Sequence, residues 1–327
     1  MIEPERAAHK QRAAAAYEVD CRVAAQIDPA DSVFMCGFWR SGTTWLQETL
    51  VQSLHAKLVF EPLYYPVPDM QAIYAHEQLQ DKDKRFLHVF MPYREGRLEG
   101  HPLYDFFARA LRSTLPGRWV RIYRRELAES ERTRIVLKCV RSQLCLRAVQ
   151  NTFGMPVICI HRDPRAVLAS LRTIHWFKFF KKISLRKQLL KPADGRAEFF
   201  GRWRDEIMHY DQQDVVSRVA AYWALTEKFV QHSYADNRAR AVFVSYEDLC
   251  RRREKLLAEI FQQLGVRSAA EDVLQALDND SSSTVQQRRG ASVTERLSGW
   301  RNVLSSDESE AIAGIATHFG FADRLVA

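Results

Sequence analysis

The sequence predicts an α/β fold, in which a parallel sheet carries helices on both faces within a single domain that has helical insertions. Three short runs, at 33–36, 135–140 and 157–160, are almost wholly apolar, and each is followed by a stretch with helical spacing. Continuous rather than alternating apolar strands between helices are typical of parallel sheets buried on both sides. The chain of 327 residues is long enough for one large domain of this class.

A glycine-bearing turn joins the first apolar run to its helix. Gly37 and Gly42 are separated by four residues and followed by Thr43 and Thr44, which is the spacing of a phosphate-binding P-loop. Nucleoside triphosphatases carry a lysine at the position of Thr43, and the cation of this segment is instead Arg40. Such a turn directs backbone N–H groups and the positive end of a helix dipole at one point. We therefore expect a P-loop-like sheet that binds phosphate or sulfate; a turn that only joins a strand to a helix is the alternative.

Charge and composition limit the class of protein. The formal net charge of +8 predicts an anionic partner, without choosing among a nucleotide, an acidic glycan, nucleic acid and a membrane surface. The six cysteines form no C-x-x-C pair, so we expect free thiols in a reducing compartment and no metal site. No window reaches the roughly 18 apolar residues of a membrane span, and the first 20 residues are charged and rich in alanine. These features predict a soluble, cytoplasmic protein.

The other elements follow from apolar spacing and from the positions of proline and glycine. Residues 1–31 are expected to form a peripheral N-terminal helical extension ahead of the main domain, 32–327. A short strand at 58–60 stops at Glu61-Pro62, and 70–117 is expected to be a mainly helical insertion that covers the substrate. Further helices are expected at 142–153, 165–174, 213–235, 254–264, 269–278 and 306–318, with a strand at 241–244 and a flexible segment at 281–290.

Residues 178–191 hold six basic side chains and no acidic one, interleaved with Phe179, Phe180, Ile183 and Leu189. This pattern predicts a basic amphipathic helix that contacts a membrane surface or an acidic acceptor. The alternative is a solvated helix face with a few core residues.

A second polar segment follows the strand at 157–160. Arg162 comes just after the strand, at the sheet edge where ligands bind in open α/β folds, and Ser170 lies about two helical turns further on. An arginine and a hydroxyl at this edge suit a phosphate. A nucleoside triphosphatase would place a magnesium-binding aspartate at the end of such a strand, whereas this strand delivers His161 and Arg162.

Together, Gly37–Trp45 and the pair Arg162 and Ser170 resemble the two signature segments of sulfotransferases that use 3′-phosphoadenosine 5′-phosphosulfate (PAPS). In that family the first segment binds the 5′-phosphosulfate and the second the 3′-phosphate. Residues 39–42, 60–62 and 162–167 look most like the carbohydrate 6-O-sulfotransferase branch. Residues 246–249 and 300–304 are also similar to the family, whereas 65–130 and 178–210, where the acceptor would be recognised, show little resemblance.

The resemblance implies metal-independent transfer of a sulfuryl group from PAPS to a hydroxyl of a glycan, glycolipid or secondary metabolite. The product would be adenosine 3′,5′-bisphosphate (PAP). Arg40 stands where the family carries its catalytic cation, and Lys138 matches a lysine that faces the sulfuryl group; for Lys138, a surface lysine at a strand end is the alternative. The donor-binding residues that the resemblance implies are Arg40, Ser41, Gly42, Thr43, Thr44, Trp45, Arg162, Ser170 and Arg289, with a solvated basic loop as the alternative for Arg289.

The general base is less well determined. Cytosolic members place a histidine two residues after the lysine, and this chain has Val140 there. Glu61 matches a carboxylate of carbohydrate sulfotransferases and is the candidate base, with a structural ion pair as the alternative, because nearby cations would make it a poor base. His55, His88, His101 and His175 belong to no motif.

The expected partners are the nucleotide donor and a hydroxylated small-molecule or glycan acceptor, with no nucleic acid. The sequence identifies neither the acceptor nor the oligomeric state, a homodimer being one option. Two hypotheses compete with the transferase: a P-loop nucleoside triphosphatase or kinase-like protein, and a non-enzymatic protein that binds polyanions through its basic surface.

Overall fold

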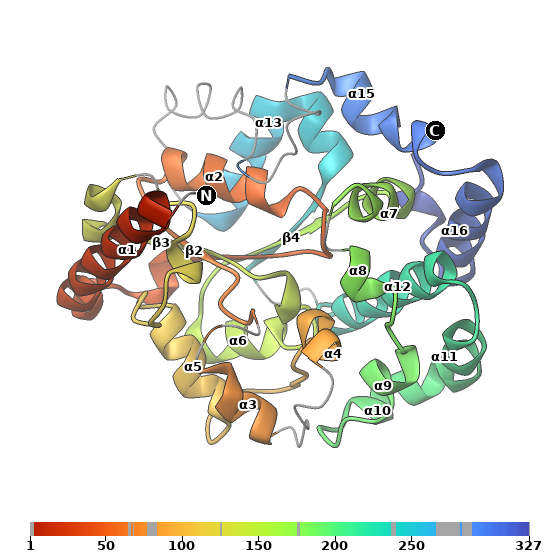
Figure 1. The fold of residues 1–327 in the computed structure, drawn as a ribbon, viewed down its shortest axis with the longest axis horizontal. Coiled ribbons are helices and arrows are strands. Elements are labelled where there is room, and N and C mark those ends of the chain that lie inside the picture. The colour runs from red at the N-terminus through yellow and green to blue at the C-terminus, as the bar shows by residue number, and fades with distance from the viewer. Residues whose placement is uncertain are drawn as a thin grey trace.

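A five-stranded parallel sheet lies at the centre of the protein, with the strand order β2-β3-β1-β4-β5 (Figure 1). The structure is a computed structural model that describes residues 3–64, 67, 69–76, 84–124, 126–174, 177–236, 240–265, 282 and 290–326. The strands are β1 Val33–Cys36, β2 Lys57–Phe60, β3 Ile135–Lys138, β4 Val157–His161 and β5 Ala241–Ser245. The predicted parallel sheet is confirmed.

Helices cover both faces of this sheet, as expected. Side chains alternate along β1, so that Val33 and Met35 pack against α2 and α13, while Phe34 and Cys36 pack against α5 and α6. The helices are α1 Glu3–Val23, α2 Thr43–Ser53, α3 Met70–His76, α4 Lys84–Val89, α5 Pro102–Ala110, α6 Leu146–Phe153, α7 Pro164–Arg172, α8 Phe177–Phe180, α9 Leu185–Leu189, α10 Arg196–Phe200, α11 Arg204–Asp211, α12 Val215–Ser233, α13 Tyr246–Leu264, α15 Val293–Ser298 and α16 Ser306–His318.

A third hydrophobic cluster lies beside the carboxyl ends of the strands. It joins α7, α12 and α16 to the short helices α8–α10 and to Phe38 and Trp39 of the glycine turn. Figure 1 shows these helices together in the right-hand part of the molecule. The segment that follows β1 therefore packs into this cluster through Phe38 and Trp39.

Local sequence explains where the helices next to the site begin. The Asp163 carboxylate accepts a hydrogen bond from the N–H of Arg165, and Pro164 occupies the first helical position of α7. Asp214 caps α12 in the same way. In the described ranges, no helix is both long enough and apolar enough to cross a membrane.

The N-terminal helix is tied to the sheet by a buried ionic network, so the expectation of a peripheral helix is wrong for its last turn. Asp20 is fully buried, and its carboxylate accepts hydrogen bonds from Lys57 of β2 at 3.1 Å, Arg121 at 2.7 Å and Arg124 at 2.7 and 2.8 Å. The Ser113 hydroxyl donates to the same carboxylate at 3.0 Å. Helix α1 thereby holds the chain around residues 113–124 against the edge of the sheet.

The basic segment 178–191 is not one helix, in contrast to the expectation. Two short helices, α8 and α9, are separated where Ser184 caps α9 by accepting a hydrogen bond from the N–H of Lys187. Phe180, Ile183 and Leu189 are buried in the third cluster, while the six basic side chains are exposed. Contact of this segment with a membrane stays a prediction.

Other boundaries differ from the expected ones. Helix α6 begins later than expected, because residues 140–142 form a 3₁₀ turn, and α13 begins earlier, because Ser245 caps it. The expected helix at 269–278 and nearly all of the expected flexible segment at 281–290 lie outside the described residues.

Candidate active site

The two glycines of the turn are required by its close contacts. A Cβ on Gly37 would lie 2.2 Å from the carbonyl oxygen of Ile160 in β4. Gly42 has a φ of +88°, and a Cβ there would lie 2.3 Å from the ring of Tyr246. Only glycine fits these two positions without displacing the neighbouring atoms of Ile160 and Tyr246.

The turn ends at a helix N-terminus that lacks a capping side chain. Gly42 is the N-cap of α2, and Thr43, Thr44 and Trp45 form the first helical turn, whose N–H groups have no partners within the helix. The Ser41 hydroxyl is buried and has no hydrogen-bond partner among the described residues. Uncapped N–H groups beside an unpartnered hydroxyl are the donors that a phosphate or sulfate group requires.

Arg40 connects this turn to the second polar segment. Its backbone is in the left-handed region, with a φ of +68°, and its Nε donates a hydrogen bond to the Ser170 hydroxyl at 3.0 Å. The Arg162 guanidinium donates to the Arg40 carbonyl at 3.0 Å. Residues that are more than 120 positions apart in the chain therefore meet at the carboxyl edge of β1 and β4.

Tyr246 contacts Arg162 and Glu247 binds the next residue, Asp163, although neither residue had an individual role in the sequence analysis. The Arg162 guanidinium lies over the Tyr246 ring at 4.2 Å and also donates to the Arg296 carbonyl at 3.2 Å. Glu247 accepts a hydrogen bond from the N–H of Asp163 at 3.0 Å. The Arg162 Nε is buried and has no hydrogen-bond partner among the described residues. The guanidinium is thus held in place while one of its N–H groups stays available to an anion.

A second cluster of charges lies at the ends of β2 and β3. The Glu61 carboxylate forms ion pairs with Lys138 Nζ and with Arg141, both at 2.8 Å, and accepts a hydrogen bond from the N–H of Val140 at 3.0 Å. All three charged side chains are buried. The surface-lysine interpretation of Lys138 is therefore wrong, and the geometry of Glu61 fits the ion-pair interpretation, because both carboxylate oxygens are bound to cations.

Arg141 is a residue that sequence reasoning missed. It donates to the His88 carbonyl and lies over the Tyr64 ring at 4.9 Å. Burial, together with the charges of Arg141 and Lys178, lowers the pKa of His88 to about 4, so this histidine is neutral at neutral pH. His101 caps α5, His55 is exposed, and His175 and Arg289 lie outside the described residues.

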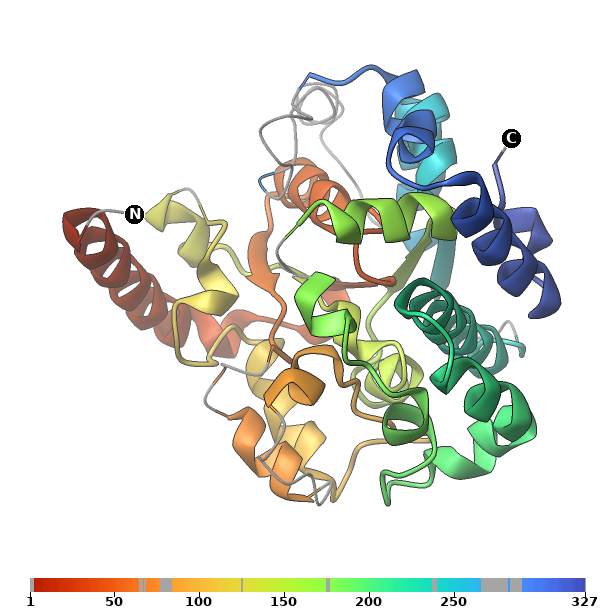
Figure 2. The same cartoon turned by 45° about the vertical axis from the view of Figure 1, so that its right-hand side comes forward.

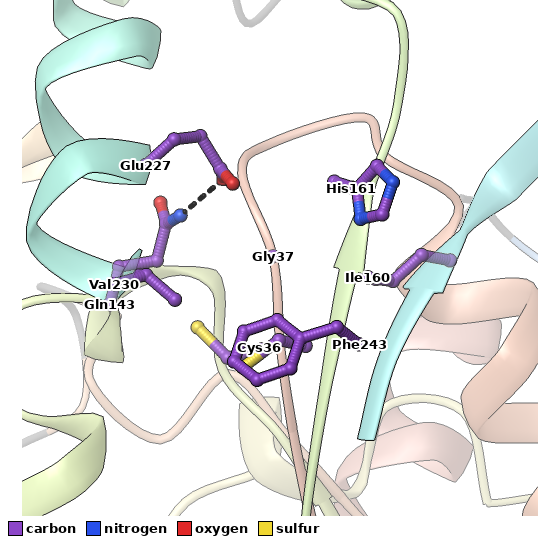
Figure 3. Close-up of a pocket in the computed structure, with 9 residues that line it drawn as sticks. Cys36, Gly37, Gln143, Ile160, His161, Glu227, Val230 and Phe243 are labelled. Carbon is purple, nitrogen blue, oxygen red and sulfur yellow. Dashed lines mark hydrogen bonds between the residues drawn. The ribbon is translucent and has the colours of Figure 1, made fainter. Parts of the chain in front are cut away.

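A small cavity lies beneath the glycine turn (Figure 3). Its volume of ≈ 10 Å³ is about that needed by one water. Gln143 donates to the Glu227 carboxyl at 2.9 Å there, and burial raises the pKa of Glu227 to about 7. Burial and Arg324 lower the pKa of His161, also at this cavity, to about 3. The cavity is far too small for a nucleotide.

Comparison with known proteins identifies the class of this site. A profile described as "Sulfotransferase family" matches residues 32–271, which include both the glycine turn and the Arg162–Ser170 segment. The chain belongs to the sulfotransferase family. The match covers most of the chain, and the finer resemblance to the carbohydrate 6-O branch stays a prediction. No curated protein matches this sulfotransferase.

Several solved structures are similar to this sulfotransferase. The sulfotransferase domain from the curacin biosynthetic pathway is 14% identical, with 88% of this chain and 97% of that chain covered and a TM-score of 0.42. A sulfotransferase from Mycobacterium avium is 13% identical, with coverage of 93% and 80% and a TM-score of 0.43. Retinol dehydratase, solved with retinol and PAP, is 13% identical, with coverage of 92% and 85% and a TM-score of 0.39.

Proposed function

We propose that this protein transfers a sulfuryl group from PAPS to a hydroxyl acceptor and releases PAP. One observation carries the proposal: Arg40, Arg162 and Ser170 meet at the uncapped N-terminus of α2. Two anion-binding segments that lie this close together suit a nucleotide with phosphate groups at both its 5′ and 3′ positions. A nucleoside triphosphatase is less well supported, because Thr43 stands in place of the P-loop lysine.

The chain offers separate donors to the two ends of such a nucleotide. The N–H groups of Gly42–Trp45 and the hydroxyls of Ser41, Thr43 and Thr44 would hold the 5′-phosphosulfate. Arg162 and Ser170 would hold the 3′-phosphate, for which the unpartnered Arg162 Nε is a ready donor. When bound, PAPS supplies a sulfuryl group on a phosphate leaving group.

Arg40 and Lys138 are the proposed catalytic cations. Arginine is always protonated, so Arg40 would stabilise charge on the leaving phosphate by hydrogen bonding rather than by giving up a proton. In this structure Arg40 donates to Ser170. Because a hydroxyl accepts and donates at the same time, Ser170 would be able to donate its O–H to a 3′-phosphate while it still accepts the hydrogen bond from Arg40. Glu61 would orient Lys138 through their ion pair. A role of Glu61 as the base that removes the proton from the acceptor hydroxyl stays a prediction.

Calorimetric titration of the purified protein tests the proposal. We expect PAP to bind without magnesium and more tightly than ATP does with magnesium. Tighter binding of ATP in a magnesium-dependent manner would overturn the proposal in favour of a nucleoside triphosphatase. A screen of hydroxylated acceptors with labelled donor then measures transfer itself.

A further inference from the structure

The last described residues of the chain return to the start of α7. We call residues 321–326 the C-terminal strap. Its first residue, Phe321, is fully buried, with its ring centre 5.3 Å from that of Trp223 and 5.1 Å from Lys228 Nζ, both in α12. A 3₁₀ helix, Ala322–Arg324, follows. Both views show this end of the chain beside α7 (Figures 1 and 2).

Two hydrogen bonds join the backbone of Val326 to the start of α7. Its N–H donates to Asp163 Oδ2 at 3.0 Å, and its carbonyl accepts from Arg165 Nη2 at 2.7 Å. Asp163 and Arg165 also form an ion pair at 2.6 Å, and the Arg165 guanidinium lies 4.2 Å from the centre of the Trp300 ring. The strap is therefore held at both of its ends, by α12 and by α7.

Asp163 connects the strap to the nucleotide site, because it directly follows Arg162 in the chain. It is buried, its carboxylate caps α7 by accepting from the N–H of Arg165, and its own N–H donates to Glu247. Among the described residues, the Val326 N–H is the one donor that reaches this carboxylate from outside α7. Loss of that donor would leave a buried, charged oxygen with one partner fewer, which is costly.

The strap also faces the residue that precedes Arg162. Burial and the charge of Arg324 lower the pKa of His161, which ends β4 and lines the small cavity in Figure 3. Arg324 and Val326 are two positions apart in the strap. The strap therefore acts on the chain on both sides of Arg162, on His161 through a charge and on Asp163 through a hydrogen bond.

Arg162 depends on such support, because its guanidinium has to meet several distant groups at once. It lies 4.2 Å from the centre of the Tyr246 ring and donates to the carbonyls of Arg40 and Arg296. A binding side chain has to be held within about 0.5 Å of its productive position by the contacts around it. The backbone at 161–163 determines where this side chain begins, and the strap binds that backbone's neighbours.

We propose that the C-terminal strap positions Arg162 for the 3′-phosphate, through the hydrogen bond from Val326 to Asp163. This inference rests on the proposed binding of PAPS. Val326 is a positioning residue, since it acts on Arg162 through Asp163 and does not itself bind the nucleotide. The strap should therefore affect the affinity for a nucleotide that carries a 3′-phosphate and leave unchanged the affinity for one that lacks it.

Val326→Pro tests the inference, because proline has no N–H to donate. Leu325, with φ −84° and ψ 119°, already has the conformation that a residue before proline prefers. Calorimetric titrations with PAP and with AMP give the preference for PAP. We expect Val326→Pro to lower this preference by about 3- to 30-fold, the range for positions that contact neither ligand, with unchanged affinity for AMP. Val326→Ala is the matched control, because it keeps both backbone hydrogen bonds and should prefer PAP as the wild type does.

A double variant shows whether the strap acts through Arg162. Arg162→Ala already lacks the guanidinium, so the addition of Val326→Pro should lower the preference for PAP no further. Three results would each overturn the inference: a wild-type preference in Val326→Pro, an equal loss of affinity for both nucleotides, or the full additional loss in the double variant. A wild-type protein that binds PAP no more tightly than AMP would instead overturn the proposed function.

Discussion

Arg40 combines two unusual features in one residue. It is a non-glycine residue with a φ of +68° inside the glycine turn, a conformation that costs on the order of 1–3 kcal/mol. Its side chain reaches Ser170, and its carbonyl is bound by Arg162. Strain that persists at a site with so many polar contacts is consistent with a functional role for the side chain.

Replacement of Arg40 should separate catalysis from folding. In Arg40→Ala we expect the turnover number to fall by about 10²- to 10³-fold, as for other lost transition-state donors, with little change in the free energy of unfolding. Arg40→Lys keeps the charge but loses the planar guanidinium, so its rate should lie between those of the wild type and Arg40→Ala. Transfer assays together with urea unfolding measure both quantities. A turnover number in Arg40→Ala equal to that of the wild type would refute the role given to Arg40.

Glu227 should make stability depend on pH. Its pKa rises from 4.5 in the unfolded chain to about 7 in the folded protein, because burial disfavours the charged carboxylate by more than Arg324 and the hydrogen bond from Gln143 favour it. The folded state therefore binds more protons than the unfolded state between these values, and stability falls as pH rises from about 4.5 to about 7. The shift corresponds to about 3 kcal/mol.

Glu227→Gln tests this expectation, because the amide cannot ionise. The variant should match the wild type near about pH 4.5 and exceed its free energy of unfolding by up to about 3 kcal/mol at about pH 8. Urea unfolding at the two pH values gives the difference, and Glu254→Gln on the exposed side of α13 is the control. An equal free-energy difference at both pH values would show that Glu227 is not the titrating group.

At the scale of elements, α1 and the chain around residues 113–124 form one unit. Asp20 of α1 binds Arg121 and Arg124. The same carboxylate binds Lys57 in β2, the strand that leads to Phe60 and Glu61. The N-terminal helix thereby holds the strand that leads to the ion pair between Glu61 and Lys138.

Removing the charge of Asp20 should lower the stability of the folded protein. Asp20→Asn leaves three buried cations with a neutral partner, so we expect a loss of about 3–5 kcal/mol in the free energy of unfolding. Urea unfolding measures this loss, with Glu18→Gln on the exposed face of α1 as the control. Stability within about 0.5 kcal/mol of the wild type would contradict the account of the network.

For the whole molecule, the sequence predicted best the position of those segments that follow a recognisable local pattern. The glycine turn and the Arg162–Ser170 segment each follow a buried strand of one parallel sheet, so their meeting at the carboxyl edge follows from topology. Segment 178–191 was predicted incorrectly, because its basic periodicity concealed the helix cap at Ser184.

Contacts between distant segments were not predictable in this way. Arg141 meets Glu61 from 80 positions away, and nothing local to Arg141 marks it as a partner. The rings of Tyr64, His88 and Phe179 also meet from three separate segments, and no local pattern predicts these contacts. Asp20 lies in a helix without an apolar stripe, so its burial follows only from the three cations that surround it.

The most direct test of the account compares two nucleotides, PAP and AMP, which differ in the 3′-phosphate. Calorimetric titration of both into the wild type, Arg162→Ala and Ser170→Ala isolates the contribution of that group. We expect the wild type to prefer PAP, and each variant to lose about 10-fold or more of this preference while its affinity for AMP changes little, since a charged hydrogen bond contributes about 1.5–3 kcal/mol. An unchanged preference for PAP in both variants would contradict the claim that Arg162 and Ser170 bind the far end of a nucleotide held by the glycine turn.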